Sequence, residues 1–406
     1  MTKAYQATSV RAVVENGLCI GCGLCEALAP ERWVMRMTAQ GRLRPAPRVK
    51  EDPQADAPIL AACPGVVAEA EARGASSDPI WGSYMQMHEA WAGDPDLRFK
   101  AATGGALTAL GVHLLSSGKA AFILHCGADP AQPMRSRWVI SETPEAVRAN
   151  AGSRYGPTDT LAGLEVALAR GQPFAIIAKP CDAGAVKARA KSDSRLDALL
   201  VALLVMVCGG ASDLGKSEAV LRELALTEDD VTLFRYRGYG NPGPTRIEAR
   251  DGRCFEKTYN EMWADEAGWR IQTRCKLCPD AIGEAADVAA ADIWPDANPQ
   301  GEDEGFNGVI TRTPAGQALV DAAIAAGDLV KGQVHNPRDY DHFQPHQVRK
   351  KHAIASRLRG LTSAERPVFA HKGLRIEELD AKDIKEEQGA EARARAGRFD
   401  DEVPNP

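Results

Sequence analysis

The sequence predicts an α/β protein, α+β overall, whose core is a mostly parallel sheet. Between about residues 80 and 210 the apolar runs "AAFILHC" (120–126), "PFAIIA" (173–178) and "LLVALLVMV" (199–207) alternate with segments of helical character. Strands that alternate with helices indicate parallel pairing, and apolar runs without polar alternation fit strands buried on both faces. The chain has 406 residues, which is enough for two or three domains with their own cores.

The predicted helices have recognisable ends. "TGGALTALGVHLLSSGK" (103–119) is a glycine turn followed by an amphipathic helix that ends at Gly118, and "TPEAVRANAG" (143–152) begins with a threonine cap and a proline. Farther along, a hairpin is predicted around Asp251-Gly252. "GFNGVITRTPAGQALVDAAIAAGDL" (305–329) predicts a strand followed by a helix that starts at a proline.

Charge and hydropathy exclude two classes of function. The formal net charge is -6, whereas a general nucleic-acid binder normally shows a basic field. The longest apolar run, Ala198 to Val207, is about half a membrane span, and the start "MTKAYQATSVRAVVENG" has no apolar signal-peptide core. We therefore expect a soluble, cytoplasmic protein with neither a nucleic-acid partner nor a membrane span.

The chain divides into four expected segments. Residues 1–75 form a small, loop-rich module that is poorly supplied with core and needs a metal or a cluster to hold it. Residues 76–215 form the α/β region, and residues 216–350 a second α/β region of mixed pattern. Residues 351–406 are a charged and alanine-rich tail, which we expect to be helical or flexible and without catalytic groups.

The stretch "CIGCGLCEALAP" (19–30) begins like a bacterial ferredoxin motif, with three cysteines at two-residue intervals. Ala29 stands where the motif has its fourth cysteine, which in two-cluster ferredoxins ligates the other cluster. This cluster then needs a distant Cys-Pro, and Cys63-Pro64 supplies one. We predict a ferredoxin-like module with a [4Fe–4S] cluster on Cys19, Cys22, Cys25 and Cys63. Zinc or unligated cysteines are the alternative.

The remaining cysteines are less specific by spacing. Ten cysteines in a cytosolic chain of this length do not suggest a disulfide framework. Cys181 and Cys208 each follow an apolar run, and carboxyl ends of parallel strands are where α/β sheets bind ligands. "CKLC", with Cys275 and Cys278, could complete a second four-thiolate site, or be redox-active or zinc-binding by itself. Cys181 and Cys208 could equally be buried core residues.

An ordered set of motifs resembles a known family. The motifs are "CIGCGLC" with "ACPG", "ATGG" (102–105), "GSRYGP" (152–157), "KPCDAGAVKA" (179–188), "VCGG" (207–210), "CKLCPD" (275–280), "AADIW" (290–294) and "GVITRTPAG" (308–316). From about residue 15 to 345 the chain resembles the coenzyme F420 hydrogenase/dehydrogenase beta-subunit family. That family includes hydrogenase and formate dehydrogenase beta subunits. It also includes ferredoxin-dependent reductases such as hydroxymethyl-chlorophyll reductase and divinyl-chlorophyllide vinyl reductase.

The resemblance implies cofactors and site residues. Members similar to these carry FAD and one or two [4Fe–4S] clusters, so residues 76–215 are expected to bind FAD and a second cluster is expected. The matching positions for the second cluster are Cys181, Cys208, Cys275 and Cys278, and those for the cofactor are Thr103, Gly104, Gly105, Gly152, Ser153, Arg154, Tyr155 and Lys179. Lys179 stands where the family often has threonine or leucine, and Trp294 follows the "ADI" motif where the family often has an Asp-Gly or Gly-Asp pair. Both departures put the family's usual substrate in doubt.

The flavin positions also have a physical rationale. Thr103, Gly104 and Gly105 precede a helix, so backbone N–H groups and a hydroxyl could hold a pyrophosphate. Arg154 could pair with a phosphate, and Tyr155 could stack or hydrogen-bond near the flavin. An ordinary glycine turn and an ordinary loop are the alternatives.

Reduction of an organic substrate also needs a proton donor. His125, at a strand end, and Asp182, next to a predicted ligand, are the candidate catalytic residues. A satisfied core histidine and a helix N-cap are the respective alternatives.

The main functional prediction is a ferredoxin-dependent FAD and [4Fe–4S] reductase. Electrons from ferredoxin or another low-potential donor would pass through the clusters to FAD and then to an organic, tetrapyrrole-like substrate. One alternative is an F420-interacting beta subunit, an electron-transfer module of a hydrogenase or dehydrogenase complex. The other is a zinc-stapled binding protein without a redox role. The sequence leaves open a homo-oligomer or a larger redox complex.

Overall fold

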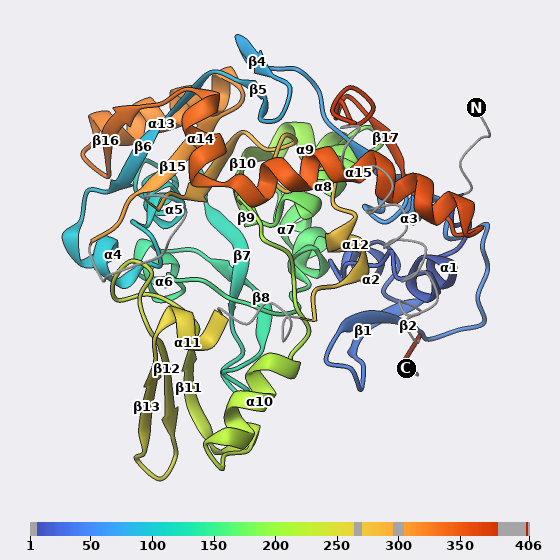
Figure 1. Ribbon diagram of the computed structural model, residues 1–406, viewed down its shortest axis with the longest axis horizontal. Helices are drawn as coiled ribbons and strands as arrows, with labels where there is room; N and C mark the ends of the chain where they lie inside the picture. The colour runs from blue at the N-terminus through green and yellow to red at the C-terminus, as the bar shows by residue number, and fades with distance from the viewer. Residues whose placement is uncertain (1–5, 264–269, 295–303, 381–402, 405–406) are drawn as a thin grey trace.

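An eight-stranded sheet forms the centre of the protein (Figure 1). The computed structural model describes residues 6–263, 270–294, 304–380 and 403–404. The strand order is β16-β6-β15-β14-β10-β9-β7-β8. In chain order these strands are β6 (Gln86–Ala92), β7 (Phe122–Ala128), β8 (Ser136–Ser141), β9 (Phe174–Ala178), β10 (Leu200–Met206), β14 (Val288–Asp292), β15 (Asn307–Thr311) and β16 (Leu329–Val334). The three apolar runs of the sequence correspond to β7, β9 and β10, so their prediction as strands is confirmed.

The sheet is mixed, which corrects the expected mostly parallel sheet. The central strands β14, β10, β9 and β7 are parallel to one another. On either side, β8 pairs antiparallel with β7, and β15, β6 and β16 continue antiparallel from β14. Parallel pairing needs a crossover of about a dozen residues or more. Residues 129–135 alone join β7 to β8, so these two strands pair as a hairpin.

Helices cover both faces of this sheet. On one face α5 (Ala106–Ser116), α6 (Pro144–Ala149) and α13 (Pro314–Ala325) share a core with Ile123. On the other face α7 (Leu164–Ala169), α8 (Pro180–Ala190) and α9 (Ser194–Leu199) share a core with Leu124. Successive strand residues point to opposite faces, so these neighbours in β7 serve different cores. Burial on both faces explains why the strand sequences are continuously apolar.

The N-terminal segment consists of short elements around the cysteine motif. These are α1 (Val10–Glu15), α2 (Leu24–Leu28), β1 (Trp33–Met37), β2 (Leu43–Pro47), α3 (Ala57–Ala62) and β3 (Val67–Glu69). Strands β1 and β2 form a separate antiparallel pair, and β4 (Ser76–Asp78) and β5 (Gly82–Tyr84) form another. Strand β3 pairs with β17 (Ala370–Lys372), so segments from the two ends of the chain lie together.

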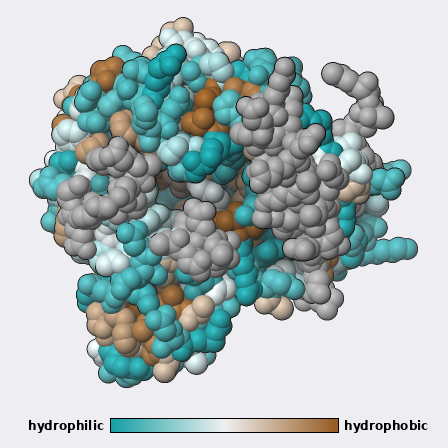
Figure 2. Space-filling view, in the orientation of Figure 1, coloured by the Kyte–Doolittle hydropathy of each residue, from teal (hydrophilic) through white to brown (hydrophobic). Residues whose placement is uncertain are grey.

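A smaller lobe projects from the main body. It contains α10 (Gly215–Glu223), the 3-10 turn η2 (Glu228–Asp230), β11 (Val231–Arg235), β12 (Thr245–Ala249), β13 (Cys254–Lys257) and α11 (Tyr259–Trp263). The predicted hairpin around Asp251-Gly252 is confirmed by the antiparallel pairing of β12 with β13. Figure 2 shows hydrophobic residues, in brown, among hydrophilic ones on the visible face of this lobe.

The C-terminal segment, residues 337–380, packs against the main body of the protein. It contains α14 (Pro337–Phe343), the long helix α15 (Pro345–Ser363) and β17, and α15 crosses the front of the molecule in Figure 1. Ile354, Leu358 and Phe369 are buried in one apolar core with residues of the N-terminal segment. Of the expected tail, residues 381–402 and 405–406 lie outside the described residues. Within the described ranges, every helix is too short or too polar to cross a membrane.

Candidate functional site

The carboxyl edge of the parallel strands carries several of the predicted site residues. Cys181 is the second residue of α8, which begins directly after β9, and Cys208 follows the end of β10. Asp292 ends β14 in the next position of the sheet. Ligands of α/β proteins bind outside this edge, so the arrangement agrees with a functional site there.

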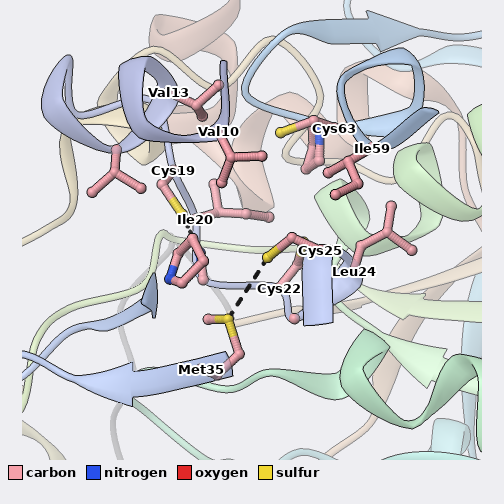
Figure 3. Close-up of a pocket in the computed structure, with 15 residues that line it drawn as sticks. Val10, Val13, Cys19, Ile20, Cys22, Leu24, Cys25, Met35, Ile59 and Cys63 are labelled. Carbon is pink, nitrogen blue, oxygen red and sulfur yellow. Dashed lines mark hydrogen bonds between the residues drawn. The ribbon is translucent and has the colours of Figure 1, made fainter. Parts of the chain in front are cut away.

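A first cavity collects the N-terminal cysteines (Figure 3). Its lining contains the four predicted ligands Cys19, Cys22, Cys25 and Cys63. The other lining residues are apolar or glycine: Val10, Val13, Val14, Ile20, Gly21, Gly23, Leu24, Met35, Pro45, Ile59 and Pro64. Among the residues that the structure describes, none that lines this cavity carries a charged side chain. The structure therefore brings together the four cysteines that the spacing grouped.

Two glycines let the chain wrap around this cavity. Gly21 and Gly23 have φ angles of 71° and 86°, in the left-handed region that favours glycine. A Cβ on Gly21 would lie 2.5 Å from the Leu43 carbonyl oxygen, so the loop also packs closely on β2. The Gly21 N–H donates to the Cys19 sulfur at 3.4 Å, and the Cys25 thiol lies 3.9 Å from the Met35 sulfur.

A second cavity collects the other predicted cysteines. Cys181, Cys208, Cys275 and Cys278 line it together, and they come from α8, the loop after β10, and α12 (Thr273–Lys276) with its following turn. The Ala211 N–H donates to the Cys275 sulfur at 3.4 Å. Unlike the first cavity, this one is also lined by charged side chains, namely Lys179, Asp280 and Lys350. Ile20 lines both cavities, so the two sites adjoin.

Burial dominates the acid–base behaviour of these thiols. It raises the pKa of Cys63 to about 12, with a contribution from Cys19, and the pKa of Cys208 to about 11, with contributions from Cys275 and Cys278. Burial likewise raises the pKa of Cys22, Cys25, Cys181 and Cys278. Thiolates at these positions therefore need a positive partner, and a bound metal is such a partner. Among the described residues, no group of three or more His, Cys, Asp or Glu is placed to hold a single metal ion.

Lys179 and Asp182 form a buried ion pair near both cavities. The Lys179 ammonium lies 2.9 Å from the Asp182 carboxylate and donates to the Thr158 carbonyl at 3.0 Å. Burial alone would lower the pKa of Lys179, but the Asp182 carboxylate outweighs it and the pKa is raised, so Lys179 is a cation. Asp182 also accepts the Lys179 backbone N–H at the start of α8, where Lys179 is the N-cap and Asp182 the third helical residue, so the N-cap alternative for Asp182 was off by one turn of the helix. The Asp182 charge acts on both Cys22 and Cys181.

His125 lies in the sheet and lines neither cavity. It is buried in β7, and its Nε2 is 2.8 Å from the Ser141 hydroxyl of β8. Burial lowers the pKa of His125 to about 4. These contacts match a satisfied core histidine, and the proton-donor role stays a prediction.

The predicted flavin turn is engaged by the protein itself. The Thr103 hydroxyl donates to Asp292 at 2.5 Å, and the Ala106 N–H at the start of α5 donates to the Asn307 side chain at 3.0 Å. A Cβ on Gly104 would lie 2.8 Å from the Phe306 Cα, so the backbone there covers the turn. In this arrangement Thr103, Gly104 and Gly105 are buried, and their binding of a pyrophosphate stays a prediction.

The second predicted flavin motif, from Gly152 through Ser153 to Tyr155, is also occupied by internal contacts. The Arg154 guanidinium donates to the Ser136 hydroxyl and to the carbonyls of Pro133, Arg135 and Phe234, which ties β8 to β11. Tyr155 packs with its ring 4.5 Å from that of Trp263. At the start of the motif, a Cβ on Gly152 would lie 3.0 Å from the Arg237 carbonyl oxygen. These contacts hold Arg154 within the protein, and its pairing with a phosphate stays a prediction.

The structure identifies Arg237, which the sequence did not indicate, as the centre of this region. Arg237 is buried, and its guanidinium lies 2.7 Å from the Asp292 carboxylate, 3.1 Å from the Thr103 hydroxyl and 3.1 Å from the Tyr155 hydroxyl. It also lies over the Trp294 ring at 5.2 Å. One arginine thus joins three of the sequence motifs. Only its position in a glycine-rich loop hinted at a special role, since no spacing rule links these motifs.

Known proteins match most of the chain. Two family profiles of the coenzyme F420 hydrogenase/dehydrogenase beta subunit apply: the N-terminal profile matches residues 87–165, and the C-terminal profile matches residues 171–336. Coenzyme F420 hydrogenase subunit beta of Methanothermobacter thermautotrophicus is 23% identical over 259 residues, which are 61% of this chain and 84% of that protein. A chain of the F420-reducing [NiFe] hydrogenase complex from Methanosarcina barkeri has a similar fold. Its TM-score is 0.51 at 18% identity, with 69% of this chain and 96% of that chain covered.

These matches divide the candidate site. The second cysteine cavity draws its four cysteines from the segment 171–336, inside the matched C-terminal profile. The first cavity lies before residue 87, and α15 lies after residue 336, so both fall outside the matched profiles.

Proposed function

The chain belongs to the coenzyme F420 hydrogenase/dehydrogenase beta-subunit family, and we propose that it is an iron–sulfur electron-transfer protein of that type. We assign one [4Fe–4S] cluster to each of the two cysteine cavities. The observation that carries the proposal is that two adjoining cavities are each lined by four cysteines. Clusters bound there would supply one-electron transfer, with the protein setting their spacing and potentials.

The surroundings of the sulfurs favour clusters over zinc. Each thiolate of a four-iron cluster binds a different iron, whereas a structural zinc gathers its thiolates around one ion. Cys19, Cys22 and Cys25 follow the two-residue spacing of a cluster motif, and Cys63 lines the same cavity. Backbone N–H groups donate to Cys19 and Cys275, and such hydrogen bonds to sulfur stabilise electron-rich clusters.

The comparisons support an electron-transfer subunit better than a self-contained reductase. The curated relative is a hydrogenase subunit, and the solved structure is a hydrogenase complex. A ferredoxin-dependent FAD reductase of an organic substrate, the main prediction from the sequence, has less support, because both of these matches are to hydrogenase proteins. We therefore propose that the protein works within a larger redox complex. The binding of FAD and the reduction of an organic substrate are separate predictions.

Anaerobic purification tests the proposal directly. Iron, acid-labile sulfide, zinc and flavin are measured per chain, together with the electron paramagnetic resonance of the dithionite-reduced protein. We expect about eight irons and about eight sulfides per chain, because each of the two proposed [4Fe–4S] clusters contains four of each. Absence of iron from an anaerobic preparation would overturn the proposal, and stoichiometric zinc would establish the zinc alternative. The flavin content decides the FAD prediction independently.

The acceptor separates the two redox functions. Dithionite-reduced protein, freed of excess reductant, is mixed with coenzyme F420 and, separately, with a chlorophyllide. Loss of the F420 absorbance would support the beta-subunit function. Reduction of the chlorophyllide instead would restore the reductase prediction.

A further inference from the structure

Helix α15 holds both halves of the second cysteine cavity through their backbone carbonyls. The Gln347 amide donates to the Cys208 carbonyl at 2.9 Å, and the Lys350 ammonium donates to the Gly209 carbonyl at 3.3 Å. On the other half of the cavity, the Arg357 guanidinium donates at 2.7 Å to the Lys276 carbonyl, between Cys275 and Cys278. Three side chains of one helix therefore join two cysteine loops that are far apart in the sequence.

The same helix also packs behind the first cavity. Ile354 and Leu358 belong to a buried core that includes Val13 and Leu18 of the N-terminal segment. Cys19 and Cys63 are packed against this core, which also contains Leu277 from the second cavity's side. Helix α15 thus touches the protein shell of both cavities, although it lies beyond the matched family profiles.

Lys350 gives the second cavity a charge that the first lacks. Its side chain lines the second cavity, and its positive charge favours the thiolate forms of Cys208 and Cys278. Among the described lining residues Asp280 is the one carboxylate, and both of its oxygens accept the Glu284 N–H at 2.9 Å. Lys179, the other cation that lines the cavity, is paired with Asp182. Lys350 is therefore the cation of this lining that has no carboxylate within 4 Å among the described residues.

We propose that α15 is a functional part of the second cysteine site. Gln347 and Arg357 are positioning residues that hold the two cysteine loops at the distance a cluster requires. Lys350 raises the reduction potential of a cluster held in the second cavity above that of a cluster in the first. The inference rests on the proposed function, because it concerns the properties of the clusters.

Lys350→Met tests the electrostatic part, with Arg349→Met as the matched control. Arg349 is the preceding exposed cation on the same helix, and it lines neither cavity. The midpoint potential of each cluster is measured by redox titration monitored by electron paramagnetic resonance. We expect Lys350→Met to lower the reduced-to-oxidised ratio of the second cluster about tenfold at a given potential, which is about 59 mV for one electron. The first cluster should keep its potential in Lys350→Met. In Lys350→Arg, which keeps the positive charge, the second cluster should have the potential of the wild type.

Two outcomes would overturn this assignment of Lys350. One is an unchanged second potential in Lys350→Met, and the other is an equal shift in Arg349→Met. If the wild-type protein holds no iron, the proposed function itself fails before any variant is compared. Iron at full stoichiometry with unshifted potentials leaves the proposed function standing and removes only the electrostatic role of Lys350.

Gln347→Leu tests the positioning part. It keeps the approximate size of the side chain but removes the donor to the Cys208 carbonyl. We expect iron to leave the second site several-fold faster in the presence of a chelator, and the resonance spectrum of the second cluster to broaden. The first cluster serves as the internal reference. A lower melting temperature with unchanged iron release and an unchanged spectrum would show that Gln347 only stabilises the fold, and would refute its positioning role.

Discussion

The two cysteine cavities present the same donors in different surroundings. The first is lined by aliphatic side chains, glycines and prolines around Cys19, Cys22, Cys25 and Cys63. The second adds Lys179, Asp280 and Lys350 to its four cysteines. Potentials of iron–sulfur clusters depend on nearby charge, hydrogen bonds and solvent exposure as well as on the ligands. The comparison teaches that the surroundings, rather than the ligand set, are what can give the two sites different properties.

The cavities also differ in their place in the family. The second uses residues of the matched segment 171–336 and stands at the carboxyl edge of the sheet, where the fold binds ligands. The first uses a segment that precedes the matched region and is held by α2, which contacts α7, and by β3, which pairs with β17. The first cysteine site thus adjoins the profile-matched core, and Ile20 lines both cavities where they meet.

Removing one cysteine, from either cavity in turn, should have the largest effect and tests whether the two cavities are separate cluster sites. Cys63→Ser should lose about half of the iron, as should Cys278→Ser, because each variant deprives one four-iron cluster of a ligand. Iron and sulfide analysis under anaerobic conditions measures the loss, and resonance spectra identify the surviving cluster. Cys254→Ser, at an exposed cysteine outside both cavities, is the control. Complete loss of iron in either variant would contradict two independent sites.

Breaking the buried pair near both cavities should have the next largest effect. Lys179→Met leaves the Asp182 carboxylate buried without its counter-ion and should cost about 3–5 kcal/mol of unfolding free energy. The double variant Lys179→Met/Asp182→Asn should recover most of that loss, since a neutral amide replaces the stranded charge. Chemical denaturation under argon measures both. If the double variant is no more stable than the single one, the pair does not act as a unit.

The sequence predicted the cysteine grouping better than the architecture around it. Spacing grouped Cys19, Cys22 and Cys25 because neighbouring residues stay close in space, and the Cys-Pro pattern added Cys63. The strands β7, β9 and β10 followed from their apolar runs, which report burial directly. Pairing direction at the sheet edges did not follow, because periodicity reports local structure and not which strand lies beside which.

The contacts of Arg237 and α15 could not be predicted for a similar reason. Arg237 meets Thr103 and Asp292 only after the chain has folded, and no local pattern relates these three positions. The stretch around Lys350 is rich in charged residues, yet the same helix also carries the buried Gln347 and Ile354. Propensity could indicate the helix but not the carbonyl groups that its side chains hold.

Arg274, next to Cys275 of the second cavity, donates hydrogen bonds to Pro64 of the first, so its removal tests whether the two cavities depend on each other. Its guanidinium donates to the Pro64 carbonyl at 2.7 and 3.0 Å, directly after Cys63, and lies over the Phe369 ring at 4.0 Å. Arg274→Met should cost about 2–3 kcal/mol, because the buried Pro64 carbonyl loses both of its charged donors. Iron release should accelerate at both sites, since the Arg274 charge acts on Cys63 and Cys278. Acceleration at one site alone would show that the cavities are not joined here.

The smallest expected effect is that of His125, which should change the acid stability of the fold without changing the cysteine cavities. Because burial lowers the pKa of His125 to about 4, the folded protein keeps this ring neutral while the unfolded chain protonates it near pH 6.5. Stability is therefore fully present above pH 6.5 and falls as the pH drops from 6.5 towards 4, by about 2 kcal/mol at pH 5. His125→Gln should abolish that part of the acid sensitivity, measured by chemical denaturation at pH 7 and pH 5 under argon.

The matched measurement for this prediction is iron content at the same two pH values. His125 lines neither cavity, so His125→Gln should leave the iron retained at pH 5 equal to that of the wild type. Equal acid sensitivity of unfolding in variant and wild type would mean that other groups cause it. A change in iron retention would tie His125 to the cysteine sites after all, and would revive its role as a proton donor beside them.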